Sequence, residues 1–394
     1  MELEKSFYKH LAQTTGSPML LKFSKANGIY LYDDKDEKYL DFISGIAVAN
    51  IGHSHPKVIS AVKEQVDKHM HLMVYGEYIQ NTQVKYAESI TNELAAELQT
   101  VYWVNSGTEA TEGAFKLSRR VTGRSEIISF KGSYHGSTIG ALSSMGNEKY
   151  KRAFRPLVPD HRQLEFNDIE SLNEISSKTA AVIVECVQAG TGYKKADKVF
   201  LEELSRQCSK IGAMLIVDEC QTAFGRTGDL FAHQEYRITP DILCLGKALG
   251  GGMPLGAFIS SKSKMMKLTH DPILGHITTF GGNPVSCAAG HAAFQVLKSS
   301  GWLADVQKRG ELIKKVLRSH PRVCEVSGTG LLLSVTLETE DLKYLVYKKL
   351  IERKIITNFF LFNNEALRIT PPLCVTVNEI DYFNSNFIQI LDEL

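Results

Sequence analysis

The stretch 240-PDILCLGKALGGGMPLGA-257 joins a short apolar run to a loop of small residues with one lysine near its centre. The run DILCL has the length and composition of a buried β-strand. Lys247 follows it directly, between small residues that leave space around its amine. A primary amine in such a place can condense with a carbonyl group. The stretch therefore predicts a buried strand that ends at a reactive lysine.

Four similar apolar runs precede this one along the chain: TVYWV (100–104), EIISF (126–130), AAVIV (180–184) and AMLIV (213–217). Each is followed by polar or helical sequence, which predicts a mainly parallel sheet covered by helices. Residues that follow parallel strands gather at one edge of the sheet. We therefore expect Ser106, Glu185, Asp218 and Lys247 to lie near one another.

The two ends of the chain differ from this α/β pattern. Residues 290–320 predict a long amphipathic helix, followed by a strand in 330–337 and a helix near 344–354. The alternating segments 29–34 and 38–42 predict strands that join this C-terminal part. We expect a large domain over 49–290 and a smaller α+β domain built from 1–48 and 291–394.

Composition gives little indication of a macromolecular partner. The 45 basic and 44 acidic residues leave a net charge of +1, which argues against nucleic acid and anionic membranes as partners. The seven cysteines form no CxxC pair, and the paired histidines 53/55 and 69/71 suggest no third ligand, so we expect neither disulfides nor a metal. The sequence starts without a signal-peptide pattern, and we expect a cytoplasmic protein.

Three further segments suggest a site for a flat, phosphorylated cofactor, although each has an ordinary structural explanation. Asp218 ends a strand and could pair with a pyridine nitrogen, or simply cap the next helix. NSGTEA (105–110) starts a helix and could bind a phosphate, or form an ordinary N-cap. Tyr134 could stack on a ring, and Arg368 could bind a carboxylate, but both residue types also occur in ordinary packing and on surfaces.

Taken together, the segments resemble the class III aminotransferases, which use pyridoxal 5'-phosphate (PLP). The resemblance rests on eight segments in the same order: 39–56, NSGTEA, YHG (134–136), VDECQTAFGRTG (217–228), 240–257, TTFGGNP (278–284), SGTGLL (327–332) and LRITPPL (367–373). It implies the fold-type I architecture of PLP-dependent transferases, with a mainly parallel seven-stranded sheet, and a homodimer with shared active sites.

The resemblance also implies a role for each site residue. Lys247 would be the Schiff-base lysine and proton carrier, and Asp218 would face the ring nitrogen. The other cofactor contacts would be Ser106, Gly107, Thr108, Tyr134, His135, Glu185, Gln221 and, from the neighbouring subunit, Thr279. Arg368 would bind a substrate carboxylate.

Two departures from the family pattern concern the substrate. Where members commonly read VEPIQGEGG, this chain reads VECVQAGTG (184–192), so Gly190 replaces a glutamate that pairs with the carboxylate-binding arginine. Ser137 replaces an arginine that helps to bind a dicarboxylate acceptor or an α-carboxylate. Ile46 and, from the other subunit, Tyr75 are further candidates for the substrate channel, and Ile46 could equally be a core residue.

The resemblance thus indicates an aminotransferase that moves an amino group from an acetylornithine- or ornithine-like amino acid or an ω-amine donor to a 2-oxo acid acceptor. Gly190 and Ser137 favour an alternative, an ω-amino acid or amine:pyruvate aminotransferase. An aminomutase, a racemase or a decarboxylase would share Lys247 and Asp218 on the same fold.

Overall fold

The central sheet has seven strands in the order β4-β12-β11-β10-β7-β5-β6. In the computed structural model, which describes residues 2–394, they are β4 (Thr100–Val104), β5 (Glu126–Phe130), β6 (His161–Leu164), β7 (Thr179–Val184), β10 (Met214–Asp218), β11 (Ile242–Leu245) and β12 (Gly256–Ser260). Only β12 pairs antiparallel with its neighbours, β4 and β11. The mainly parallel sheet is therefore confirmed, and all five apolar runs are strands of it.

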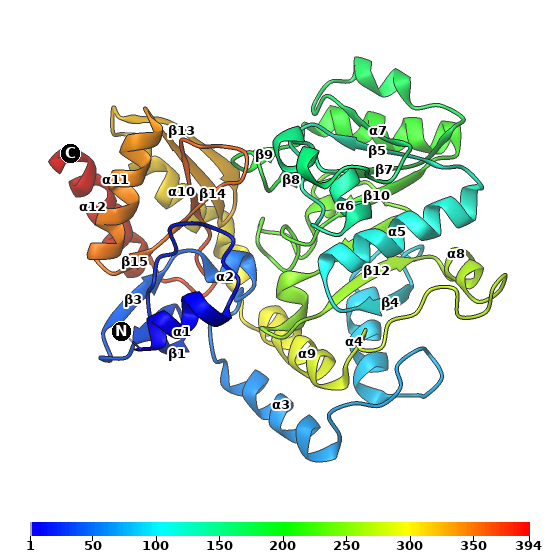
Figure 1. The fold of residues 1–394 in the computed structure, drawn as a ribbon, viewed down its shortest axis with the longest axis horizontal. Coiled ribbons are helices and arrows are strands. Elements are labelled where there is room, and N and C mark those ends of the chain that lie inside the picture. The colour runs from blue at the N-terminus through cyan, green and yellow to red at the C-terminus, as the bar shows by residue number, and fades with distance from the viewer. Residues whose placement is uncertain (1) are drawn as a thin grey trace.

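The two faces of the sheet pack against different helices. Along β7, Ala181 and Ile183 belong to the core under helix α5 (Gly107–Thr122), whereas Val182 and Val184 belong to the core under helix α7 (Lys198–Ile211). Figure 1 shows α5 and α7 on different sides of the strands. Because both faces are covered, every residue of β7 is buried, which explains its continuous apolar sequence.

The chain ends form a second lobe, on the left of Figure 1. Its two sheets have the orders β1-β2-β3-β15 and β13-β14-β17-β16. The strands are β1 (Phe23–Asn27), β2 (Tyr30–Asp33), β3 (Lys38–Asp41), β13 (Val323–Thr329), β14 (Leu332–Leu337), β15 (Ile355–Ile356), β16 (Asn358–Phe359) and β17 (Ala366–Ile369). β3 pairs in parallel with β15, so the N-terminal strands join the C-terminal part as predicted.

The other helices and a short hairpin complete the fold. The helices are α1 (Glu2–His10), α2 (Ser44–Ala47), α3 (Pro56–Lys68), α4 (Asn81–Thr91), α6 (Ile139–Ser143), α8 (Lys262–Met265), α9 (Pro284–Ser299), α10 (Val306–Leu317), α11 (Glu340–Glu352) and α12 (Val377–Glu393). The hairpin of β8 (Val187–Gln188) and β9 (Lys194–Lys195) lies where the two lobes meet (Figure 1).

The prediction of one long helix over 290–320 is wrong, because α9 ends at Ser299 and α10 begins at Val306. Gly301 separates them with a φ of 73°, a left-handed conformation that glycine adopts without steric cost. The boundary that we set at 290 falls inside α9, which packs against α3 and α4 of the large lobe. We propose that the domain boundary lies after this helix.

Candidate active site

A cavity of about 590 Å³ opens where the central strands end. Part of its lining follows those strands directly and is called the sheet wall here: Gly107, Thr108, Tyr134, His135, Asp218, Gln221 and Lys247. The rest comes from segments far apart in the sequence and is called the assembled wall: Ile46, Ser137, Gly190, Asn358, Phe359, Leu361 and Arg368. The structure thus brings together most of the predicted site residues.

Asp218 and His135 form a buried ion pair on the sheet wall. Asp218 ends β10, and its Oδ2 lies 2.8 Å from His135 Nδ1, while its Oδ1 accepts a hydrogen bond from the Cys220 amide at 3.0 Å. Burial raises the pKa of Asp218, but the hydrogen bond and charge of His135 outweigh it and hold this pKa below its usual value. Burial lowers the pKa of His135, and Asp218 in turn raises it above the usual value. The pair therefore keeps a carboxylate charged at the cavity wall.

Glu185 lies behind this wall and does not line the cavity. Its Oε2 accepts a hydrogen bond from the Tyr134 amide at 3.1 Å, and its Oε1 accepts one from the Ala189 amide at 2.9 Å. Burial raises the pKa of Glu185 to about 7, against the opposing effect of nearby His135. Glu185 thus ties the Tyr134 loop to the segment that leads to Gly190.

The N-terminus of α5 contributes small and hydroxyl side chains to the sheet wall. Ser106 is the N-cap, and its hydroxyl accepts from the Glu109 amide at 3.3 Å, so the ordinary capping explanation applies to this side chain. Thr108 Oγ1 lies 2.7 Å from Thr138 Oγ1, a contact that sequence reasoning missed. A Cβ on Gly107 would lie 2.7 Å from Cys220 Sγ, so only glycine fits there without a shift.

Lys247 follows β11 in a conformation that is unusual for its residue type. Its φ is 48°, in the left-handed region, and a single 3₁₀ turn, Lys247–Gly250, follows it. Gly246 permits this approach, because a Cβ there would lie 3.1 Å from the Gly107 Cα. Within residues 2–394 the Lys247 amine makes no hydrogen bond or ion pair with another side chain. It is therefore available at the cavity wall.

Arg368, on β17, brings a buried positive charge to the assembled wall. Its Nη2 donates to the Ala189 carbonyl oxygen at 3.2 Å, and its guanidinium lies over the rings of Phe360 and Tyr193. The Tyr193 hydroxyl accepts a hydrogen bond from Gln221 Nε2 at 3.0 Å. Tyr193 therefore connects a residue of the sheet wall to Arg368, which the sequence did not indicate.

The space beside Gly190 is filled by an aromatic ring. A Cβ on Gly190 would overlap the Phe362 ring, and the Phe362 amide donates to the Gly190 carbonyl oxygen at 3.0 Å. The Phe362 ring in turn packs against Tyr150 at 5.3 Å between centroids. A side chain at position 190 is thus excluded by a ring from another segment of the chain.

Ile46 and Ser137 both line the cavity. Ser137 Oγ lies 3.0 Å from the Tyr134 hydroxyl. Ile46 sits in a left-handed turn with a φ of 62°, which is strained for a β-branched residue. The turn is held at Ser44, whose hydroxyl donates to the Thr370 carbonyl oxygen at 2.7 Å and accepts from Arg226 at 3.2 Å. Ile46 is therefore a cavity residue and not a core residue.

Thr279 and Tyr75, both assigned to a neighbouring subunit, do not line the cavity of their own chain. Thr279 is exposed in a loop whose neighbours Ile273 and Phe280 are also exposed, at 77% and 56%. This loop contacts the segment before α4, since the rings of Phe280 and His71 are 4.9 Å apart and Asn283 donates to the Met70 carbonyl oxygen. Ile79 of that segment is 96% exposed.

The histidines of the pairs 53/55 and 69/71 contact neighbouring protein groups. His53 Nε2 lies 2.7 Å from Asp41 Oδ2, and the His55 side chain caps α3. His69 packs near Gln65, and His71 near Phe280. In the described part of the chain, no group of three or more His, Cys, Asp or Glu side chains is placed to hold a metal ion. No helix in residues 2–394 is long and apolar enough to cross a membrane.

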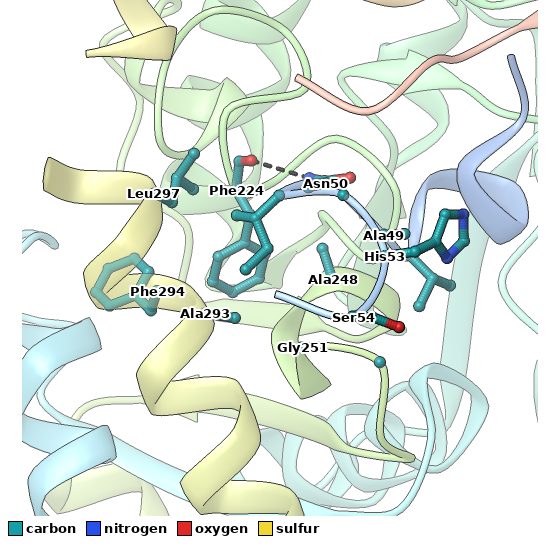
Figure 2. Close-up of a pocket in the computed structure, with 14 residues that line it drawn as sticks. Ala49, Asn50, His53, Ser54, Phe224, Ala248, Gly251, Ala293, Phe294 and Leu297 are labelled. Atoms are coloured by element: carbon teal, nitrogen blue, oxygen red, sulfur yellow. Dashed lines mark hydrogen bonds between the residues drawn. The ribbon is translucent and has the colours of Figure 1, made fainter. Parts of the chain in front are cut away.

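A second cavity, of about 90 Å³, adjoins the lysine loop but shares no lining residue with the larger one. Figure 2 shows Ala248 and Gly251 facing Phe294 and Leu297 of α9, with Asn50 donating to the Phe224 carbonyl oxygen at 2.9 Å. The walls are mostly apolar, and the volume is small compared with that of the larger cavity. The larger cavity is therefore the candidate active site.

The residues of the sheet wall fit PLP in their chemistry. The charged Asp218 matches a protonated pyridine nitrogen, and the free Lys247 amine matches an aldehyde. The α5 N-terminus, with Gly107 and the Thr108 hydroxyl, matches a phosphate.

Comparisons with known proteins agree with this geometry. The family described as Aminotransferase class-III matches residues 11–391. The acetylornithine aminotransferases of Bacillus cereus and Methanocaldococcus jannaschii are each 37% identical to this chain. The first alignment covers 94% of this chain and 95% of the relative, and the second covers 100% and 97%.

A solved structure leads to the same family. The crystal structure of ornithine aminotransferase from Toxoplasma gondii superposes with a TM-score of 0.91 at 26% identity, over 100% of this chain and 96% of that chain. The match covers both lobes, so it extends beyond the site. The chain therefore belongs to the class III aminotransferases, enzymes that take an amino donor and an oxo acid acceptor.

Proposed function

We propose that this enzyme uses PLP to transfer an amino group from an acetylornithine- or ornithine-like donor to a 2-oxo acid. The observation that carries this proposal is the meeting of Lys247, Asp218 and Arg368 in one cavity. Two of these side chains suit the cofactor, and the third suits a substrate carboxylate. The similarity to acetylornithine aminotransferases supports the choice of donor.

The sheet wall would hold the cofactor. Gly107 and Thr108, with Ser106 at the cap, would bind the phosphate, and Tyr134 would stack on the ring. Asp218, held charged by His135, would face the ring nitrogen, while Gln221 would donate to the ring hydroxyl and Glu185 would support the Tyr134 loop. When bound, PLP supplies an electron sink for the charge left on the substrate carbon after proton removal.

Lys247 would move the proton. Its Nζ would take the proton from the amine-bearing carbon of the donor, as a general base. Arg368 would orient the substrate by binding its carboxylate. Ile46, Phe359 and Leu361 would contact the substrate chain and exclude water from it.

We also propose that two copies of the chain form a dimer through the loop that carries Thr279 and the neighbouring segment 70–79. Apolar side chains exposed together usually mark an interface. Here they are Met70, Ile79, Ile273, Leu274, Ile277 and Phe280. Thr279 and Tyr75 lie within these segments, which would allow each subunit to complete the site of the other. Sedimentation of Ile79→Asp would test this, because a dimer of the variant as tight as that of the wild type would refute it.

A screen of donors against acceptors, with PLP added to the purified protein, tests the proposed function. With N-acetyl-L-ornithine or L-ornithine as the donor, we expect 2-oxoglutarate to be converted to glutamate or pyruvate to alanine. No transfer with any donor would contradict the assignment. The screen also tests the alternative, an amine:pyruvate aminotransferase. Ser137 favours it because, among the residues lining the cavity, Lys247 and Arg368 are the only cationic side chains that are not paired with an acidic one, which leaves no further cation for a dicarboxylate. Turnover of simple amines with pyruvate would support that alternative.

A further inference from the structure

Arg368 carries a buried charge without a carboxylate partner. The residue is only 6% exposed, its one hydrogen bond goes from Nη2 to the Ala189 carbonyl oxygen, and its Nε has no partner. Within residues 2–394 no acidic oxygen lies within 4.0 Å of its guanidinium. Burying an unpaired cation is unfavourable, so the guanidinium retains a strong tendency to bind an anion.

Two aromatic rings fix the guanidinium in place. Its central carbon lies 4.7 Å from the Phe360 ring centre and 5.4 Å from that of Tyr193, and the two rings meet edge to face at 4.8 Å. Both residues are buried, and the Tyr193 hydroxyl is held by Gln221. A cation–π contact uses no oxygen acceptor, so the N–H groups of Arg368 stay available.

The same region excludes the acidic residue that would neutralise Arg368. Gly190 adjoins Ala189, the hydrogen-bond partner of Arg368, but the Phe362 ring occupies the space that a side chain at Gly190 would need. Asp218 is the only acidic residue that lines the cavity, and it is already paired with His135. No carboxylate of the cavity lining therefore competes with a substrate for Arg368.

We propose that the rings of Phe360 and Tyr193 hold Arg368 as a carboxylate-binding residue in both half-reactions, so that carboxylate-bearing donors are favoured over simple amines. Phe360 and Tyr193 are positioning residues in this proposal, which rests on the proposed role of Arg368 in substrate binding. A bound amine without a carboxylate would leave the Arg368 guanidinium buried and without an anionic partner. The donor as well as the acceptor would therefore need a carboxylate that reaches Arg368.

Binding of butanoate to the PLP-loaded enzyme, measured by calorimetry, tests the proposal without turnover. We expect Phe360→Leu to weaken binding about tenfold, as loss of a desolvated cation–π contact predicts. Phe360→Tyr keeps a ring and should rescue most of that loss. Gly190→Glu combined with Phe362→Ala should also weaken butanoate binding about tenfold relative to Phe362→Ala alone, because the new carboxylate can pair with Arg368.

Kinetics with a matched pair of donors extend the test to turnover. N-acetyl-L-ornithine and N-acetyl-1,4-diaminobutane differ only in the carboxylate, and we expect Phe360→Leu to raise KM for the first with little change in kcat. Unchanged butanoate binding in both Phe360→Leu and the Gly190→Glu double variant would overturn the proposal. Failure of every donor in the screen, with butanoate binding as expected, would instead overturn the proposed function and leave Arg368 as an anion site.

Discussion

The sheet wall and the assembled wall of the cavity differ in how their charges are balanced. On the sheet wall, Asp218 at the end of β10 and His135 in the loop after β5 pair with each other at 2.8 Å. On the assembled wall, Arg368 has only a carbonyl oxygen and two rings as partners. The carboxylate of the sheet wall is thus already paired before a substrate arrives, whereas the guanidinium of the assembled wall is left for the substrate to pair.

This difference separates chemistry from selectivity. The Asp218–His135 pair keeps the same charges whichever substrate is bound, which suits the steps common to all aminotransferases. A wall with an unpaired cation gains binding free energy only from substrates that supply an anion. Changes on the sheet wall should therefore abolish turnover, and changes on the assembled wall should alter which substrates are used.

Removing the amine of Lys247 should give the largest effect. Lys247→Ala should lower kcat by roughly a thousandfold or more, because no other side chain of the sheet wall can move the proton. Single-turnover kinetics of the PLP-loaded variant would measure this. The circular dichroism spectrum should match that of the wild type, and near-normal turnover would remove Lys247 from the mechanism.

Removing the charge of Arg368 should have a smaller effect, and on a different constant. Arg368→Met should raise KM for a carboxylate-bearing donor about 10- to 100-fold, since a hydrogen bond to a charged group is worth about 1.5 to 3 kcal/mol. The change in kcat should be much smaller. Steady-state kinetics with both members of the matched donor pair would show it, and equal losses for the two donors would mean that Arg368 binds no carboxylate.

The same contrast explains what the sequence could predict. The strands, Asp218 and Lys247 follow from local patterns, because a buried parallel strand and the residue after it are adjacent in the chain. The contact of Arg368 with Tyr193 and the packing of the Phe362 ring at Gly190 join segments more than 160 residues apart, and no local pattern encodes them. The break between α9 and α10 was missed because a single glycine at 301 interrupts a continuous amphipathic pattern.

Adding a second cation to the assembled wall should change the choice of acceptor. Ser137→Arg should raise kcat/KM for 2-oxoglutarate relative to pyruvate about tenfold, by supplying a charge-assisted contact for the second carboxylate. Ser137→Ala is the matched control, because it also removes the contact with the Tyr134 hydroxyl. An equal acceptor ratio in the two variants would show that position 137 does not reach the acceptor.

The smallest expected effect concerns Glu185, which lies behind the sheet wall, and is measured as the pH dependence of protein stability. The folded-state pKa of Glu185 is raised from 4.5 to about 7, so its contribution to stability is fully present below about pH 4.5 and is lost as the pH rises through 7. Glu185→Gln cannot titrate, and it should flatten the fall in thermal midpoint between pH 5 and 8. The variant should be less stable at every pH, because its amide nitrogen would face the Tyr134 or Ala189 N–H. Only the slope therefore reports the titration, and an unchanged slope would mean that another group, such as His135, causes the pH dependence of this wall.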